Sequence, residues 1–141
     1  MNATTPAIQD LARRLIDLEA AREEPQVAGG GAAVRACEKL RVPLAKLVGV
    51  TGFRSLQSRA LVLAKAEIPS LDAVQVRPDG SLEGWDRIGR TQDAEAGAAV
   101  VAQLLGLLVT FIGEPLTLHL VRDGWPDASV AGIAAGSGEG S

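Results

Sequence analysis

Aromatic residues are scarce in this chain: Phe53, Phe111, Trp85 and Trp125 are the only ones among 141 residues, and tyrosine is absent. The core must therefore be built mainly from leucine, valine, isoleucine and alanine. Such a core suits helix packing better than an all-β sandwich, whose strands are rich in aromatic and β-branched residues. The chain is long enough for one domain with a real core. We predict a single, mainly α-helical domain.

Reactive side chains are also few, because cysteine and histidine occur once each, as Cys37 and His119. A single cysteine excludes an intrachain disulfide and a cysteine-based metal site, and its apolar neighbours indicate a buried thiol. A single histidine cannot form a metal site unless several carboxylates join it. We therefore expect neither a metal nor a cofactor.

A secretory signal is missing as well, since the N-terminal MNATTPAIQD has no basic region and no apolar core. Paired cysteines, which mark oxidising compartments, are also lacking. Both absences favour a cytoplasmic protein.

The longest uncharged stretch covers residues 96–113, AGAAVVAQLLGLLVTFIG. As a helix it would be about 27 Å long, just short of the apolar thickness of a membrane. Polar Gln103 at its centre, many small residues and acidic flanks favour a central buried helix instead. A seam of small residues four apart, at Ala98, Ala102 and Gly106, would let another helix approach closely. A membrane-associated protein that uses segment 96–113 is the first alternative.

The N-terminal region predicts an amphipathic helix over residues 5–24. Thr5 followed by Pro6 is a helix start, because threonine caps the first turn and proline fits it. Apolar residues then recur at helical spacing, and this stripe needs a partner. The stripe consists of Ile8, Leu11, Leu15 and Leu18. It could pack on its own domain, or helix 5–24 could be a separate interaction arm.

The middle of the chain predicts two further helical regions after a glycine-rich break at residues 29–31. The first covers residues 32–48 and is kinked or divided at Pro43. The second covers residues 53–67 and ends there because Pro69 follows.

The C-terminal half begins with a predicted β-hairpin near residues 73–84, where alternating valines precede a Pro-Asp-Gly turn. After the long apolar helix, a final helix at residues 115–124 is favoured over a strand. The tail, residues 128–141, is expected to be flexible. The expected fold is thus one helical domain over residues 1–127, with five or six helices and one small hairpin.

Charge is distributed unevenly: residues 25–70 carry seven basic and two acidic side chains, whereas residues 71–141 carry four basic and ten acidic ones. Opposed charges of this kind suit internal complementarity, self-association or an acidic partner. The candidate contact residues for a protein partner or an anion are Lys46, Arg54, Ser58, Arg59 and Lys65. The acidic net charge of −3 and the lack of a nucleic-acid-reading motif argue against nucleic acid.

No catalytic signature stands out in the chain. His119 and Asp123 would share a helix face, but no serine lies in a nucleophile context. We therefore predict a non-enzymatic protein–protein interaction or regulatory module that acts through helix-face contacts and self-associates or joins an assembly. Its predicted oligomer interface is the stripe of Ile8, Leu11, Leu15 and Leu18. The second alternative is a small anion-binding protein or enzyme that uses Arg54, Arg59 and His119.

Overall fold

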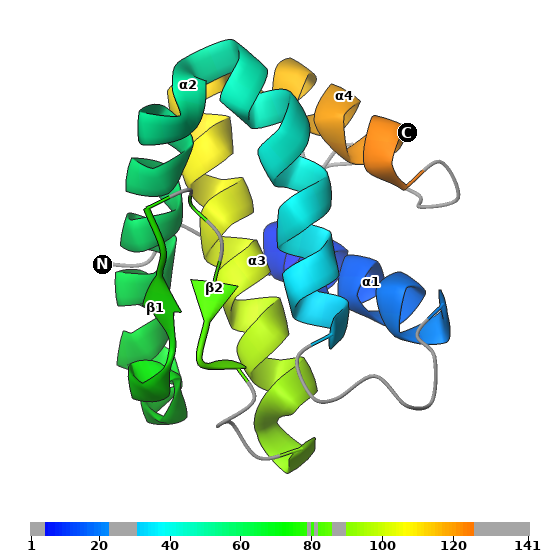
Figure 1. The fold of residues 1–141 in the computed structure, drawn as a ribbon. Coiled ribbons are helices and arrows are strands. Elements are labelled where there is room, and N and C mark those ends of the chain that lie inside the picture. Colours follow the sequence, from blue (N-terminus) through cyan, green and yellow to red (C-terminus); the bar gives the residue numbers. More distant parts are fainter. Residues whose placement is uncertain (1–4, 23–30, 79, 81, 86–89, 126–141) are drawn as a thin grey trace.

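A computed structural model describes residues 5–22, 31–78, 80, 82–85 and 90–125. These residues form four helices and one two-stranded sheet (Figure 1). In chain order the elements are α1 (Pro6–Arg22), α2 (Gly31–Glu67), the 3-10 helix η1 (Pro69–Ala73), β1 (Gln75–Val76), β2 (Leu82–Glu83), α3 (Arg90–Ile112) and α4 (Glu114–Gly124). The mainly helical prediction is confirmed. The tail 128–141 and most of the break at 29–31 lie outside the described residues.

Helix α1 starts where the capping pattern predicts. The Ile8 backbone N–H donates to the Thr5 hydroxyl at 3.3 Å, and the helix begins at Pro6. The helix packs on α2 and α3. Its apolar stripe lies inside the molecule, because Ile8, Leu11 and Leu15 are buried and Leu18 is half-buried against the core. The surface predicted as an oligomer interface is thus largely filled by contacts within the chain.

Helix α2 reverses direction at Gly49, where φ is +82°. Glycine suits this position because L side chains rarely adopt a positive φ. Residues 31–48, the first arm, and residues 50–67, the second arm, run in opposite directions, and α3 is seen between them (Figure 1). The predicted count of five or six helices is not confirmed, because the two arms follow one another without a loop and form one element. Pro43 lies within the first arm without ending it.

The predicted hairpin is confirmed, with Val76 opposite Leu82 in an antiparallel pair. Two such short strands are stable only when they lie on something else. Here the turn rests on the second arm: Gly80 has φ +91°, and an added Cβ would lie 2.5 Å from the Phe53 ring. Trp85 is buried directly after β2.

Helix α3 is the central element, since it contacts α1, α2 and α4. Residues Glu95–Ile112 are long and apolar enough to cross a membrane by length and composition, and 61% of this window is buried inside the bundle. This is weak evidence for a membrane span, because the core helix of a bundle has the same length and composition. Gln103 lies buried on it and donates from Nε2 to the Glu67 carboxylate at 3.2 Å. The last predicted segment is helical, as α4, which follows Gly113.

Candidate interaction surface

The predicted basic contact residues do not all share one helix face. Lys46 lies on the first arm of α2, and the other four lie on the second arm. At about 100° per residue, Arg54, Ser58 and Lys65 share one side of the second arm, whereas Arg59 lies roughly 140° around the helix from Arg54. None of the four cations has an ion pair among the described residues.

The predicted histidine pair is present but open to solvent. His119 Nε2 lies 3.5 Å from Asp123 Oδ2 on α4, and both side chains are about two-thirds exposed (66% and 64%). Arg54 and Arg59 lie on the second arm, which Figure 1 places on the other side of the molecule from α4. The three residues of the anion-binding alternative are therefore not brought together. Among the described residues, no group of three or more His, Cys, Asp and Glu side chains could hold a metal ion.

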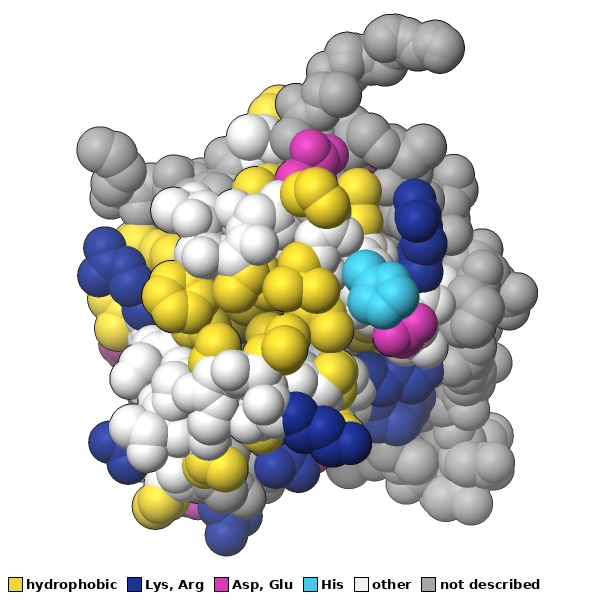
Figure 2. Space-filling view, turned by 90° about the horizontal axis from the view of Figure 1, so that it is seen from above, with side chains coloured by type: hydrophobic (Ala, Val, Ile, Leu, Met, Phe, Trp, Pro, Cys, Tyr) yellow, Lys and Arg dark blue, Asp and Glu magenta, His cyan; other side chains and the backbone are white. Residues whose placement is uncertain are grey.

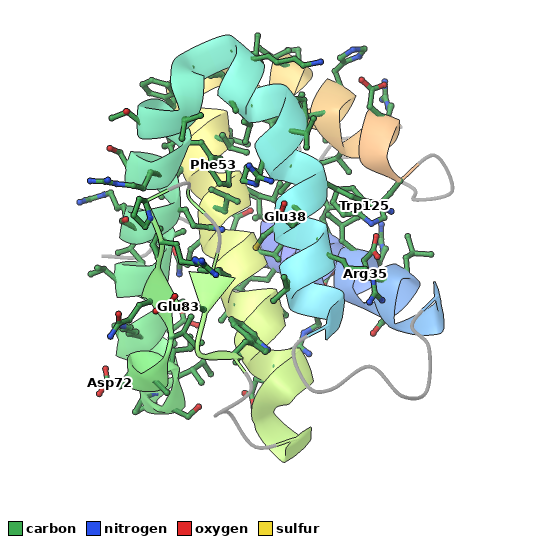
Figure 3. All side chains as sticks on the ribbon, in the orientation of Figure 1. Arg35, Glu38, Phe53, Asp72, Glu83 and Trp125 are labelled. Carbon is green, nitrogen blue, oxygen red and sulfur yellow. The ribbon has the colours of Figure 1, made fainter. Side chains whose placement is uncertain are left out.

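A buried carboxylate joins three helices. Glu19 on α1, only 1% exposed, accepts from Arg35 Nε at 3.1 Å, from Trp125 Nε1 at 2.9 Å and from Lys39 Nζ at 2.5 Å. Lys39 also donates to the Gly124 carbonyl at 3.2 Å and lies 5.2 Å from the centre of the Trp125 ring. Figure 3 shows Arg35 and Trp125 on the same side of the bundle, near α1. We call Glu19, Arg35, Lys39 and Trp125 the Glu19 cluster.

The Glu19 cluster keeps its carboxylate ionised. Burial by itself would raise the pKa of Glu19, but hydrogen bonds from Lys39 and Arg35, the charge of Lys39 and the hydrogen bond from Trp125 together lower it. Sequence reasoning missed this cluster. A signal was available, because Glu19 follows Leu15 by four residues and so continues the apolar stripe of α1. A charge on that stripe indicates a buried ion pair.

The thiol of Cys37 is buried, as predicted, and burial raises its pKa to about 12, while the nearby Gln57 amide acts in the opposite direction. A thiol with such a pKa is protonated at neutral pH and is a poor nucleophile. Gln57 is itself fully buried, and neither its amide nitrogen nor its amide oxygen has a hydrogen-bond partner of ordinary geometry within the described residues.

A polar cavity of about 110 Å³ lies between α1, the end of α2 and the N-terminal half of α3. It is lined by Gln9, Arg13, Glu67, Ile68, Glu95, Ala98, Ala99, Ala102 and Gln103. The small residues of the predicted helix–helix seam form part of its wall, so close packing against α1 is incomplete there. Space of this size between polar side chains is ordinarily filled by water.

Large apolar side chains are exposed mainly at one end of the bundle. Five such residues are exposed among those described. Three of them lie within two residues of the reversal at Gly49 or of the end of α3, and a fourth, Val42, lies about two helical turns before the reversal. These four, Val42, Leu47, Val50 and Phe111, are named the end face. Figure 2 looks onto this end and shows an apolar patch with the single histidine beside it. The fifth residue, Val62, lies on the second arm.

A groove continues the end face between the first arm and α4. Its volume is about 390 Å³, and it is lined by Lys39, Val42, Pro43, Leu120, Asp123 and Gly124. Val42 belongs both to the groove lining and to the end face, so the two surfaces are continuous. Sequence reasoning did not identify this surface, because each of its residues reads as part of an ordinary amphipathic helix.

Comparisons with protein-family models, with curated proteins and with solved structures found no match to this chain. A function for it must therefore be inferred from its own residues.

Proposed function

We propose that this protein is a non-enzymatic interaction module that associates with a second copy of itself through the end face. The observation that supports the proposal is the exposure of four apolar side chains: Val42 is 54% exposed, Leu47 53%, Val50 50% and Phe111 64%. Single exposed apolar residues are ordinary on a protein surface, but a group of them marks a contact site.

The energy available from this surface predicts weak association. Covering a half-exposed Val, Leu or Phe side chain contributes about 1 kcal/mol, so eight such side chains in a symmetric pair contribute about 8 kcal/mol. Loss of translational and rotational freedom costs about 4–15 kcal/mol. Only at the lower end of this cost does a net gain of about 4 kcal/mol remain, which corresponds to a Kd of about 1 mM, so the dimer is expected only at high concentration.

Sedimentation velocity tests the proposal. The protein is measured without detergent over a concentration series up to about 1 mM, which covers weak affinities. Leu47→Glu and Phe111→Glu each place a charge on the end face. Val62→Glu is the matched control, because Val62 is also apolar and exposed (65%) but lies twelve residues beyond Val50, about 18 Å along the helix. Circular dichroism checks that each variant is folded.

The wild type and Val62→Glu are expected to sediment faster as concentration rises, whereas Leu47→Glu and Phe111→Glu stay monomeric. A wild type that is monomeric throughout contradicts the proposal, and so does a control that loses association as Leu47→Glu does. Failure of the wild type to remain in solution without detergent supports the membrane-associated alternative instead.

A further inference from the structure

The charges beside the end face differ between its two sides. On the α2 side lie Lys46, four residues after Val42, and Arg54, four residues after Val50. Neither cation has an ion pair among the described residues. On the α4 side lie Glu114, in the first turn of the helix, and Asp123, in the groove wall. An apolar strip thus separates a basic side from a side that carries carboxylates.

Whole elements show the same asymmetry. Helix α2 holds seven basic and two acidic residues, and four of its cations have no ion pair among the described residues, whereas α4 holds one arginine and two carboxylates besides His119. Placing α2 of one copy on α2 of another would bring like charges together, and like charges across an interface oppose association. Placing α2 of one copy against α4 of the other brings opposite charges together.

Building on the proposed function, we infer that the end face is complementary to itself under a twofold rotation, with Lys46 of each copy near Asp123 of the other. In a twofold contact the same patch meets itself, so every pair of residues occurs twice. A face with Lys46 and Arg54 on one side, an apolar middle, and Glu114 and Asp123 beside Arg122 on the other side meets this requirement. The occupant of the end face is then a second copy in antiparallel orientation.

Lys46 and Asp123 are the two charged residues that we pair, because both lie near Val42. Asp123 lines the groove opposite Val42, and Lys46 lies one helical turn from Val42 on the same face. The contact of Asp123 with His119 is 3.5 Å long and exposed, and exposed pairs of this kind contribute little. The Asp123 carboxylate can therefore exchange this contact for a lysine of a second copy.

Charge reversal followed by mixing tests the inference. In a dimer of Lys46→Asp, the new carboxylate would lie near the Asp123 carboxylate of the other copy at both symmetry-related positions. In a dimer of Asp123→Lys, the new ammonium group would lie near Lys46 of the other copy. Each variant alone should dimerise at least about tenfold more weakly than the wild type, measured by sedimentation velocity. An equimolar mixture restores both opposite-charge pairs, so native mass spectrometry should show a heterodimer at concentrations where neither variant forms a homodimer.

Arg59→Asp is the control, because it changes the net charge as Lys46→Asp does but lies on the exposed second arm away from the end face. It should dimerise as the wild type does. If Leu47→Glu abolishes association while Lys46→Asp and Asp123→Lys dimerise normally, the twofold arrangement is wrong and the proposed function stands. Equal weakening by Arg59→Asp, or a mixture without heterodimer, also overturns the arrangement. A monomeric wild type overturns both.

Discussion

Replacement of Glu19 by glutamine should destabilise the fold strongly. The carboxylate accepts from Arg35, Lys39 and Trp125 at 2.5–3.1 Å and is only 1% exposed. Each hydrogen bond to a charged group contributes about 1.5–3 kcal/mol, but contributions within one cluster are not additive. Glutamine keeps one acceptor, and both cations are about one-third exposed (35% and 28%) and can hydrate. We expect a loss of about 3 kcal/mol in the free energy of unfolding, near the lower limit for breaking a buried pair.

Urea denaturation followed by circular dichroism measures this loss. Glu38→Gln is the matched control, because Glu38 makes a 2.6 Å ion pair with Arg41 at the surface of α2. Such a pair contributes about 0.5 kcal/mol or less. A loss for Glu19→Gln no larger than that of the control would refute the view that the Glu19 cluster holds α1, α2 and the end of α4 together.

The pH dependence of the same two proteins provides a second check. The folded state lowers the pKa of Glu19 below its ordinary value of 4.5. The stability that this group contributes is therefore fully present above about pH 4.5, the pKa in the unfolded chain, and is lost as pH falls through the lower folded value. Other carboxylates titrate in both proteins, so their effects cancel in the comparison. The difference in unfolding free energy between wild type and Glu19→Gln should therefore shrink below about pH 4.5. A constant difference down to pH 2 would contradict the assignment.

Three further substitutions, with one control, test the packing by urea denaturation. Gln57→Met should stabilise the fold by about 1–2 kcal/mol, because it removes a buried amide that has no hydrogen bond of ordinary geometry among the described residues. Gln103→Met should destabilise it by about 1 kcal/mol, because that amide bonds to Glu67. Equal effects at both positions would contradict this account. Gly80→Ala should cost about 2 kcal/mol, because it combines a positive φ with a Cβ only 2.5 Å from the Phe53 ring. Gly124→Ala is its control, since its Cβ would make an ordinary 3.6 Å contact with Lys39, and a Gly80→Ala variant as stable as this control would refute the argument.

Local signals predicted most elements of the fold. The Thr5–Pro6 start of α1, the end of α2 before Pro69 and the hairpin turn each depend on a few neighbouring residues, and the structure agrees with all three. The helix count could not be read from the same signals. Gly49 changes the direction of the chain within a single pair of peptide units, and sequence patterns do not distinguish such a reversal from a loop between separate helices.

The candidate site was largely beyond sequence reasoning, because it depends on which helix faces meet. The stripe of Ile8, Leu11 and Leu15 shows that α1 needs a partner but does not say which one, and the structure supplies α2 and α3. The end face gathers Leu47 and Phe111, which are far apart in the sequence. Their exposure follows from the place where α2 reverses and where α3 ends.

The uneven charge of the chain has two explanations in different parts of α2. Arg35 and Lys39, in the lower part of the first arm, neutralise Glu19 inside the molecule. Lys46 and Arg54, on the two sides of the reversal at Gly49, have no acidic partner among the described residues. Internal complementarity therefore accounts for the first pair of cations, and the proposed self-association gives Lys46 of the second pair a partner. It follows that Glu19→Gln should lower stability without changing the dimerisation of the folded protein, whereas Lys46→Asp should weaken dimerisation with little effect on monomer stability.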